Sequence, residues 1–571
     1  MRTRTALALL VSVALAQLLL SSGARAQPAH VGYVESTVHP IRVHYPTASA
    51  TTMAQAVLEF AEQSWDVQID QMGFTAPKTV DASDNTIDAL WIYLVSGDSG
   101  TSEPIGDVPG TSWTDCTTRV LIPVSLQPSL LEIYVYHEMN HALQMSMDCT
   151  EAYFAYENTT NAVTAMLFPS DILWTQYFLP TFQTYPHAGL DCTFFGDQNR
   201  AYYHYGAALF EVFLEEMYGD ADGTMLSRFW EAARQDGTVT VSGMGPYASV
   251  PNEPDLLDAM QTVLGELGVD LGEAFAAFAR WRYFVGDRDD GNHFENADHW
   301  VGSEVAVAQE HVLAELPILM ATPDVFPMDY GTVYVELDLD GLDSPNGIVF
   351  SFDGTSAVRW HVDALAVAND FTAEVTTMEL AADGTGELPL AGITDAVKVV
   401  FVISALGGET HEADSPNCQA AHGFSYGLRS EDLETMPIPD TLVPNELAPG
   451  ETLDVVVEGV GFMNGLTAEL TGTGVRVTNV VVVNENTLNL TVTADATAPE
   501  ESCDLVLTNP NGQEGLLIDA VSVVVAPDPK SGCGCNTDGS GAGGGALLFG
   551  LLVLLFIDWR RPRGPLRGRP R

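Results

Sequence analysis

The chain has 571 residues, 46% of them hydrophobic, and carries 77 acidic against 23 basic side chains. This length and composition predict about three or four domains with packed cores, and they exclude a disordered chain. The strong negative charge disfavours nucleic acid and anionic membrane surfaces as partners. It is typical of a protein that stays soluble in an extracellular medium.

The first 26 residues have the order of a secretory signal peptide. Arg2 and Arg4 form a charged start, residues 6–20 are mostly apolar, and Ala24-Arg25-Ala26 is a small-x-small cleavage site. We therefore expect residues 1–26 to be removed and the mature chain to be secreted. Disulfides form in such a compartment.

Residues 27–320 are predicted to form one α+β domain, with a small sheet followed by a helical body. Short strands are expected at 89–95 and 119–124. Apolar residues recur at helical spacing over Thr52–Met72, Ser129–Met147, Ala152–Leu167 and Tyr202–Tyr218, and Asp255–Val285 is expected to hold at least one more pair of helices. One disulfide is expected among the cysteines of this domain, and the sequence does not choose the pair among Cys116, Cys149 and Cys192.

The motif His137-Glu138-Met139-Asn140-His141 lies within the second of these helices. Residues four apart share one helix face, so both imidazoles can bind the same metal ion. Glu138 is not needed as a ligand, and its expected role is to take the proton from a metal-activated water as the general base.

Apolar sequence flanks this motif on both sides, without Pro or Gly from Ser129 to Met147, which favours a buried helix. Buried histidines and a buried glutamate cost free energy unless a partner such as a metal ion pairs them. A catalytic zinc ion also needs a third protein ligand and an open position.

The motif and the stretch after it resemble the gluzincin group of metallopeptidases. They are also similar to a set of bacterial secreted metallopeptidases whose metal-binding stretch starts with HExxHAxQ. Ala142 and Gln144 supply the Ala and Gln of that pattern here. The resemblance implies a zincin-like fold and a Zn²⁺ ion. It implies His137, His141 and Glu157 as metal ligands, Glu157 standing on the following helix. Glu151 is the alternative third ligand.

A peptidase also needs a group that steadies the oxyanion. The candidates in the sequence are Tyr202, Tyr203, His204 and Tyr205, and the sequence does not select one of them.

Two β-sandwich domains are predicted to follow, at residues 321–435 and 436–527, because strand-like alternation replaces helical periodicity. In the second, Val443-Pro444 to Glu451, Gly461-Phe462 and Thr508-Asn509-Pro510-Asn511-Gly512 resemble turns of the immunoglobulin-like IPT/TIG domains. That resemblance implies a domain that binds or spaces rather than catalyses.

Residues 528–571 contain Cys533 and Cys535 in a Gly-rich linker, then an apolar run over 541–557 and an Arg-rich end. This order resembles the MYXO-CTERM sorting tail of myxobacterial surface proteins. The resemblance implies a transmembrane sorting segment, a C-terminal sorting protease as a partner, and anchoring at the cell surface or outer membrane.

The sequence thus predicts a secreted, cell-surface zinc metallopeptidase acting on a protein or peptide substrate. The alternative is a non-catalytic adhesion or scaffold protein that retains the metallopeptidase fold. A metal-dependent hydrolase of a non-peptide substrate is a further reading.

Overall fold

The computed structural model describes residues 27–524, except 82, 98–99, 195–196, 243–244, 340–346, 392, 394, 408–420, 431–435 and 511–512. The predicted signal peptide and sorting tail lie outside the described residues. Within the described ranges, no helix is both long and apolar enough to span a membrane. The chain divides into two compact units, one ending at Met436 and one beginning at Pro437.

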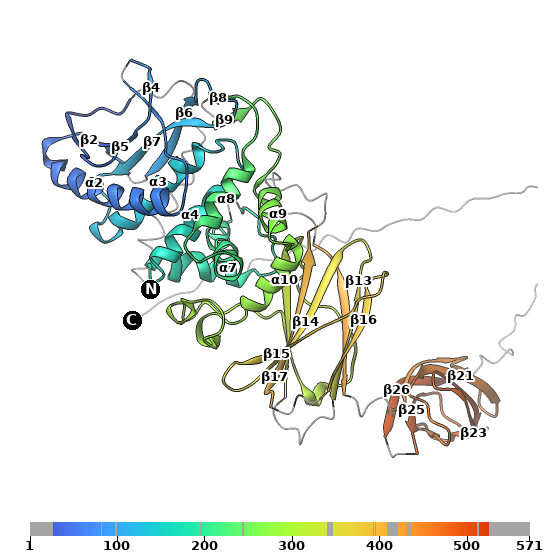
Figure 1. The fold of residues 1–571 in the computed structure, drawn as a ribbon. Helices are drawn as coiled ribbons and strands as arrows, with labels where there is room; N and C mark the ends of the chain where they lie inside the picture. The colour runs from blue at the N-terminus through green and yellow to red at the C-terminus, as the bar shows by residue number, and fades with distance from the viewer. Residues whose placement is uncertain are drawn as a thin grey trace, which may run out of the picture. The chain divides into compact units, whose positions relative to one another are not determined.

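The first unit begins with a five-stranded sheet in the order β1-β2-β5-β7-β6 (Figure 1). Its strands are β1 (Gly32–Glu35), β2 (Ile41–Tyr45), β5 (Leu90–Val95), β7 (Cys116–Pro123) and β6 (Thr101–Asp107). The three central strands β2, β5 and β7 are parallel, while β1 and β6 run antiparallel at the two edges. A small hairpin, β3 (Thr79–Val80) with β4 (Thr86–Ile87), precedes β5.

Helices α2 (Thr51–Trp65) and α3 (Leu131–Met145) cover one face of this sheet (Figure 1). Alternate strand residues such as Leu90, Ile92 and Leu94 face these helices and are at most 1% exposed. The helices are flanked by the short turns η2 (Ala48–Ala50), η3 (Asp66–Gln71) and η4 (Pro128–Leu130). The motif helix α3 is thus held against the sheet.

A helical body follows, packed around one large apolar core. Its helices are α4 (Tyr153–Leu167), η5 (Trp174–Phe178), α5 (Leu179–Thr184), α6 (Tyr203–Gly206), α7 (Leu209–Tyr218), α8 (Thr224–Ala233), α9 (Leu256–Glu266) and α10 (Leu271–Trp281). The hairpin β8 (Val239–Ser242) and β9 (Gly245–Ala248) and the turns η6 (Gly286–Arg288) and η7 (Ala297–His299) complete it. The disulfide Cys116–Cys149 ties β7 to the segment between α3 and α4.

The first β-sandwich belongs to the same compact unit. One sheet has the order β10-β12-β17-β14-β15 and the other β11-β18-β13-β16. The strands are β10 (Gln309–Val312), β11 (Ile318–Ala321), β12 (Gly331–Asp338), β13 (Gly347–Gly354), β14 (Arg359–Val367), β15 (Ala373–Thr377), β16 (Thr385–Ala391), β17 (Lys398–Leu406) and β18 (Phe424–Ser430), with the turn η8 (Leu313–Glu315).

This sandwich packs directly on the helical body. Tyr283, just after α10, joins Tyr334 and Val402 from the sheet in one buried cluster. Arg280 pairs with Asp363 at 2.7 Å, where Asp363 is 1% exposed. The sequence predicted the sandwich to start at residue 321, but its strands β10 and β11 begin before that residue. The helical body and the sandwich therefore share a continuous interface.

The second unit is a sandwich of two four-stranded sheets around its own core. The sheets have the orders β19-β21-β24-β23 and β20-β26-β25-β22. The strands are β19 (Ile438–Val443), β20 (Glu446–Leu447), β21 (Thr452–Val460), β22 (Thr467–Leu470), β23 (Val475–Asn484), β24 (Thr487–Ala494), β25 (Ser502–Thr508) and β26 (Glu514–Val523).

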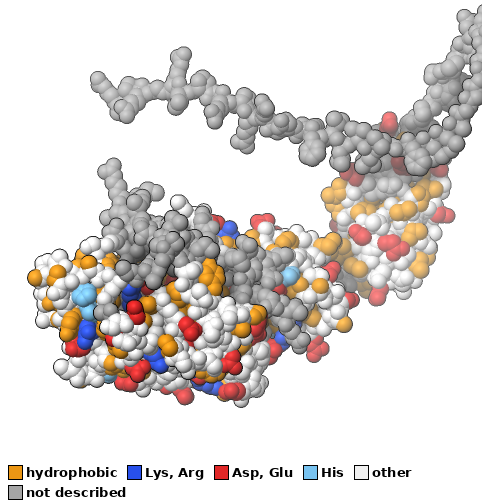
Figure 2. Space-filling model, turned by 90° about the horizontal axis from the view of Figure 1, so that it is seen from above, with side chains coloured by type: hydrophobic (Ala, Val, Ile, Leu, Met, Phe, Trp, Pro, Cys, Tyr) orange, Lys and Arg blue, Asp and Glu red, His pale blue; other side chains and the backbone are white. Residues whose placement is uncertain are grey.

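The predicted multidomain organisation of sheets and helices is confirmed, with one difference in the helical body. The single helix expected over Tyr202–Tyr218 is two helices, α6 and α7. A side chain at Gly206 would overlap the backbone carbonyl of Phe178, so only glycine permits this close approach. On the face of the first unit that Figure 2 shows, acidic side chains are scattered rather than gathered in one patch.

Candidate metal centre

The histidines of the motif stand one turn apart on α3. Their Nε2 atoms lie 3.2 Å from each other, and their rings are nearly perpendicular, at 87°. The residues just before the motif, Ile133 to Tyr136, are of types that favour strands, yet they are helical. Leu131, Val135 and Met139 form one stripe of this helix and pack against the sheet. Tertiary packing therefore outweighs the local strand preference here.

Glu157 reaches the histidines from α4, which packs against α3. Its Oε2 atom lies 3.6 Å from Nε2 of His137 and 3.8 Å from Nε2 of His141. The three ligand atoms lie within 4.8 Å of one another. Glu157 is 6% exposed and His141 8%, whereas the side chain of His137 is 19% exposed and opens the centre to solvent.

The chemistry of these atoms fits a bound cation. Glu157 Oε2 is buried and has no hydrogen-bond partner. The Nδ1 of His141 lies 2.9 Å from the carbonyl oxygen Oε1 of Gln144, which can only accept, so the proton sits on Nδ1 and the lone pair on Nε2. The Nε2 lone pair of His141 and the unpartnered oxygen of Glu157 therefore face the same point as Nε2 of His137, an arrangement that suits a positive ion.

A second layer of polar residues fixes this geometry. Gln144 donates from Nε2 to the carbonyl of Tyr156 at 3.0 Å, so its oxygen faces His141. Thr160 donates to Oδ1 of Asn140 at 2.8 Å, and Asn140 in turn donates to Oε1 of Gln68 at 2.8 Å. Such outer partners hold ligand side chains in the orientation a metal needs.

Two tyrosines flank Glu157. The hydroxyl groups of Tyr153 and Tyr205 lie 3.2 Å apart, and both hydrogen-bond to the Glu157 carboxylate. Burial raises the pKa of Glu157 to about 7, and these two hydrogen bonds oppose the rise. The tyrosines therefore orient the carboxylate and favour its charged form.

Glu138 lies on the side of α3 that faces the edge strand β6. Ser102 of β6 donates from its hydroxyl to the backbone carbonyl of Glu138, and its Oγ is 3.4 Å from the carboxylate oxygen Oε2. Burial and then the Glu157 charge raise the pKa of Glu138 to about 8, while the Ser102 hydrogen bonds lower it. A carboxyl group with this pKa can take up and release a proton near neutral pH.

Burial also keeps both histidines neutral. It lowers the pKa of His141 to about 4, and it lowers the pKa of His137 well below its usual value, with His141 adding to the effect. Neutral imidazole is the form that binds metal ions, so the histidines are ready to act as ligands.

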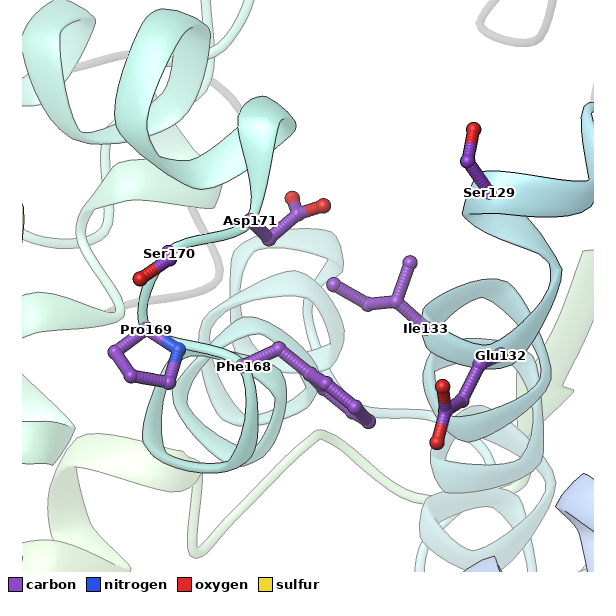
Figure 3. Close-up of a pocket in the computed structure, with 7 residues that line it drawn as sticks. All are labelled: Ser129, Glu132, Ile133, Phe168, Pro169, Ser170 and Asp171. Carbon is purple, nitrogen blue, oxygen red and sulfur yellow. The ribbon is translucent and has the colours of Figure 1, made fainter.

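A pocket of about 270 Å³ opens beside the first turns of α3 (Figure 3). Ile133 and Phe168 form apolar walls, and the carboxylate of Asp171 faces the opening from the other side. Ile133 precedes His137 by four residues and so lies on the same helix face. The pocket is thus lined from the turn of α3 that precedes His137, and none of the candidate ligands lines it.

The structure brings together His137, His141 and Glu157, with Glu138 alongside. Glu151, the alternative third ligand, does not join this group. Of the oxyanion candidates, Tyr205 reaches the centre through Glu157, whereas Tyr203 is buried in the core and donates to the carbonyl of Ala188.

Sequence reasoning did not assign Ser102, Tyr153, Thr160 or Gln68 to the centre. Thr160 could have been found, since it lies one turn after Glu157 on the same helix face. Ser102 and Gln68 are far from the motif in the sequence, and no spacing rule points to them.

No family model matches this sequence, and no curated protein matches it either. Among solved structures, one similarity is to gamma-CGTase from alkalophilic Bacillus clarkii, at 11% sequence identity and a TM-score of 0.16. It covers 36% of this chain and 22% of that chain, so the match spans well under two thirds of that enzyme. At this TM-score the likeness carries no argument about fold or function.

Proposed function

We propose that this protein is a zinc-dependent metallopeptidase of zincin-like fold that acts outside the cell. The observation that carries the proposal is the convergence of His137, His141 and Glu157 with a buried glutamate beside them. A purely structural metal site does not need Glu138. Zinc suits a set of two imidazoles and one carboxylate.

His137, His141 and Glu157 would hold the zinc ion. When bound, zinc would act as a Lewis acid that polarises the scissile carbonyl and makes a water molecule more acidic. Glu138 would hold and transfer the proton as the general base. Its placement beside Ser102 suits this role.

A peptide substrate has a natural binding surface at β6. This strand lies at the edge of the sheet, and its residue Ser102 contacts the general base. An edge strand offers backbone donors and acceptors to an extended peptide, which adds to the sheet as a further strand. The pocket beside Ile133 lies along α3 and would receive a substrate side chain.

Action outside the cell accords with the disulfide Cys116–Cys149, because structural disulfides persist in oxidising compartments. We propose that the predicted leader and sorting tail deliver the protein to the cell surface. The second β-sandwich unit would then space the catalytic unit or engage substrate.

The deciding experiment compares the purified protein with Glu138→Gln, measuring zinc content and the cleavage of unfolded casein. Glu59→Gln, the same substitution at an exposed position on α2, serves as the matched control. We expect one zinc ion per chain in all three proteins. Casein cleavage should be lost, by at least about a hundredfold, only in Glu138→Gln.

The outcomes separate the competing functions. Zinc without cleavage in the unsubstituted protein, across casein and a mixed peptide library, would favour the non-catalytic adhesion or scaffold reading. Protein without zinc after dialysis against the metal would refute the metal centre itself. Cleavage that survives Glu138→Gln would refute the role of Glu138 alone.

A further inference from the structure

A third tyrosine stands beside the candidate metal centre, in addition to Tyr153 and Tyr205. Tyr134 lies on α3, three residues before His137 and four before Glu138. Side chains at these two spacings are neighbours on a helix surface, so Tyr134 lies one turn before both residues, on the face between them. Its ring centroid is 6.4 Å from that of His137. Tyr134 is therefore next to both a candidate ligand and the candidate base.

The start of the edge strand β6 lies against the same residues. A Cβ atom added to Gly100, the residue before this strand, would lie 2.7 Å from Cε1 of Tyr134 and 3.3 Å from Oε1 of Glu138. The tyrosine ring and the carboxylate thus both approach one point of the backbone, and glycine leaves room for them there. An extended peptide that adds to β6 as a further strand would run beside this point.

The hydroxyl group of Tyr134 has an engaged oxygen and an available proton. Its oxygen accepts a hydrogen bond from the backbone N–H of Gly100. Among the residues that the structure describes, none accepts the hydroxyl proton, although Glu138 and Glu157 are near enough for their charges to act on the group. A hydroxyl group can donate one hydrogen bond while it accepts another, so this donor can serve a ligand.

The surroundings keep the proton on the tyrosine. Burial raises the pKa of Tyr134, and the charges of Glu138 and then Glu157 raise it further, while the hydrogen bond from Gly100 opposes the rise. The hydroxyl group is therefore neutral at physiological pH and acts as a hydrogen-bond donor. The side chain is only partly buried, so a substrate can reach it.

The other tyrosines near the centre are less suited to bind a substrate oxygen. Tyr153 and Tyr205 both hydrogen-bond to the carboxylate of Glu157. Tyr203 donates to a backbone carbonyl in the core. Of these four tyrosines, Tyr134 is the one whose donor is uncommitted within the described part of the chain.

We propose that Tyr134 is a catalytic residue that donates a hydrogen bond to the carbonyl oxygen of the scissile peptide bond. This inference rests on the proposed peptidase function. A donor that is held in place before reaction stabilises the negative charge that develops on this oxygen in the transition state. Glu138 acts on the water molecule and Tyr134 on the carbonyl oxygen, so two neighbours on one helix turn serve the two reacting groups.

The proton and electron transfers balance without any change in Tyr134. The oxygen of a water molecule bonds to the carbonyl carbon while Glu138 takes one proton of the water, and the π electron pair of the C=O bond moves onto the carbonyl oxygen. That oxygen accepts the hydrogen bond from Tyr134. When the C–N bond breaks, the electron pair forms the C=O bond again, and the leaving nitrogen receives the proton from Glu138.

The test compares Tyr134→Phe with the unsubstituted protein, both saturated with zinc, by calorimetric titration with two alanine-based peptide inhibitors. One is a phosphinic pseudopeptide, whose tetrahedral phosphorus carries oxygens in the positions of the transition state. The other is a thiol peptide, which binds zinc through sulfur and has no such oxygen. We expect Tyr134→Phe to bind the phosphinic pseudopeptide at least about tenfold more weakly and the thiol peptide equally well.

Casein cleavage provides a second readout. Loss of one oxyanion donor lowers kcat by roughly a hundredfold or more, so we expect that fall in Tyr134→Phe. The KM, the zinc content and the Tm should not change, whereas loss of a merely structural contact would lower the Tm. Tyr33→Phe, at a tyrosine of β1 that is 49% exposed, is the matched control and should change none of these quantities.

The outcomes separate this inference from the proposed function. The role of Tyr134 is overturned if Tyr134→Phe binds the phosphinic pseudopeptide as tightly as the unsubstituted protein does. It is also overturned if the variant loses affinity for both inhibitors equally, because that result indicates a structural role. An unsubstituted protein that binds neither inhibitor would refute the metal centre itself, and the inference with it.

Discussion

The Nδ1 atom of His141 lies 2.9 Å from the Oε1 atom of Gln144, one turn further along α3. Gln144 cannot rotate its amide freely, because its nitrogen donates to the backbone carbonyl of Tyr156 on α4. The glutamine therefore fixes both the ring orientation and the tautomer of His141. It also ties together the two helices that carry the three ligands.

Gln144→Leu should consequently lower zinc affinity about 10- to 100-fold, the usual effect of losing an outer-shell partner. The measurement is zinc competition with a chromophoric chelator at neutral pH. Gln144→Glu keeps an oxygen facing Nδ1 of His141, so it should lose less zinc affinity than Gln144→Leu. Equal affinities for all three proteins would show that Gln144 does not position His141.

Ser102 should affect turnover without affecting metal content. It contacts Glu138 but none of the three ligands, so Ser102→Ala removes one hydrogen bond that places the general base. One such bond contributes about 1 kcal/mol, so we expect kcat to fall roughly fivefold with zinc content unchanged. Thr101→Ala, at the preceding residue of β6, is the control. A loss of zinc in Ser102→Ala would contradict this role.

The two candidate histidine ligands could be predicted from the sequence because helical geometry is local and His137 and His141 are four residues apart. Glu157 was expected from the resemblance to gluzincins, with Glu151 as the alternative. Ser102 and Gln68 were not accessible, since only the tertiary packing of β6 and the turn η3 against α3 brings them to the centre.

In the fold, too, features that are local in the sequence were predicted, and features that depend on tertiary packing were not. Long periodic segments predicted α3 and α4 close to their observed bounds, and the segment predicted as one helix over Thr52–Met72 is α2 continued by η3. Periodicity did not register the interruption between α6 and α7, nor the close approach of the Phe178 backbone to Gly206. The strands β10 and β11 have four residues each, too few for alternation to identify, and only pairing with β12 and β18 defines them.

The disulfide Cys116–Cys149 closes a loop with a sequence separation of 33 residues. Loss of such a crosslink costs about 3–4 kcal/mol, so the double variant Cys116→Ser with Cys149→Ser should lower the Tm of the first unit by roughly 4 °C, a small shift because the unit is large. Zinc affinity should also fall, because Cys149 anchors the segment between α3 and α4. Calorimetry measures the first effect and chelator competition the second.

Cys503→Ser is the control for this pair, since Cys503 is a buried free cysteine in the second unit. It should leave the transition of the first unit and the zinc affinity unchanged. If the double variant melts at the same temperature as the unsubstituted protein, the crosslink does not stabilise the fold.

Glu211 of α7 lies in the helical core, is 0% exposed, and should make the first unit less stable as pH rises. Burial raises its pKa to about 8, although the Thr159 hydroxyl opposes the rise. The unfolded chain ionises this group near its usual value of 4.5, so between these two values the unfolded state binds fewer protons than the folded state. Stability from this group is therefore complete at low pH and is lost as pH rises toward 8.

Glu211→Gln removes that ionisation while keeping the side-chain shape. As pH rises through this window, the free energy of unfolding of the variant should therefore increase relative to that of the unsubstituted protein, by up to about 1.4 kcal/mol for each pH unit. Urea unfolding at pH 5, 6.5 and 8, with zinc saturating, measures the difference between the two proteins. Taking the difference cancels the other buried acids, which titrate in both. Glu59→Gln should show no such trend, and a constant difference for Glu211→Gln at all three pH values would mean that Glu211 is ionised in the fold.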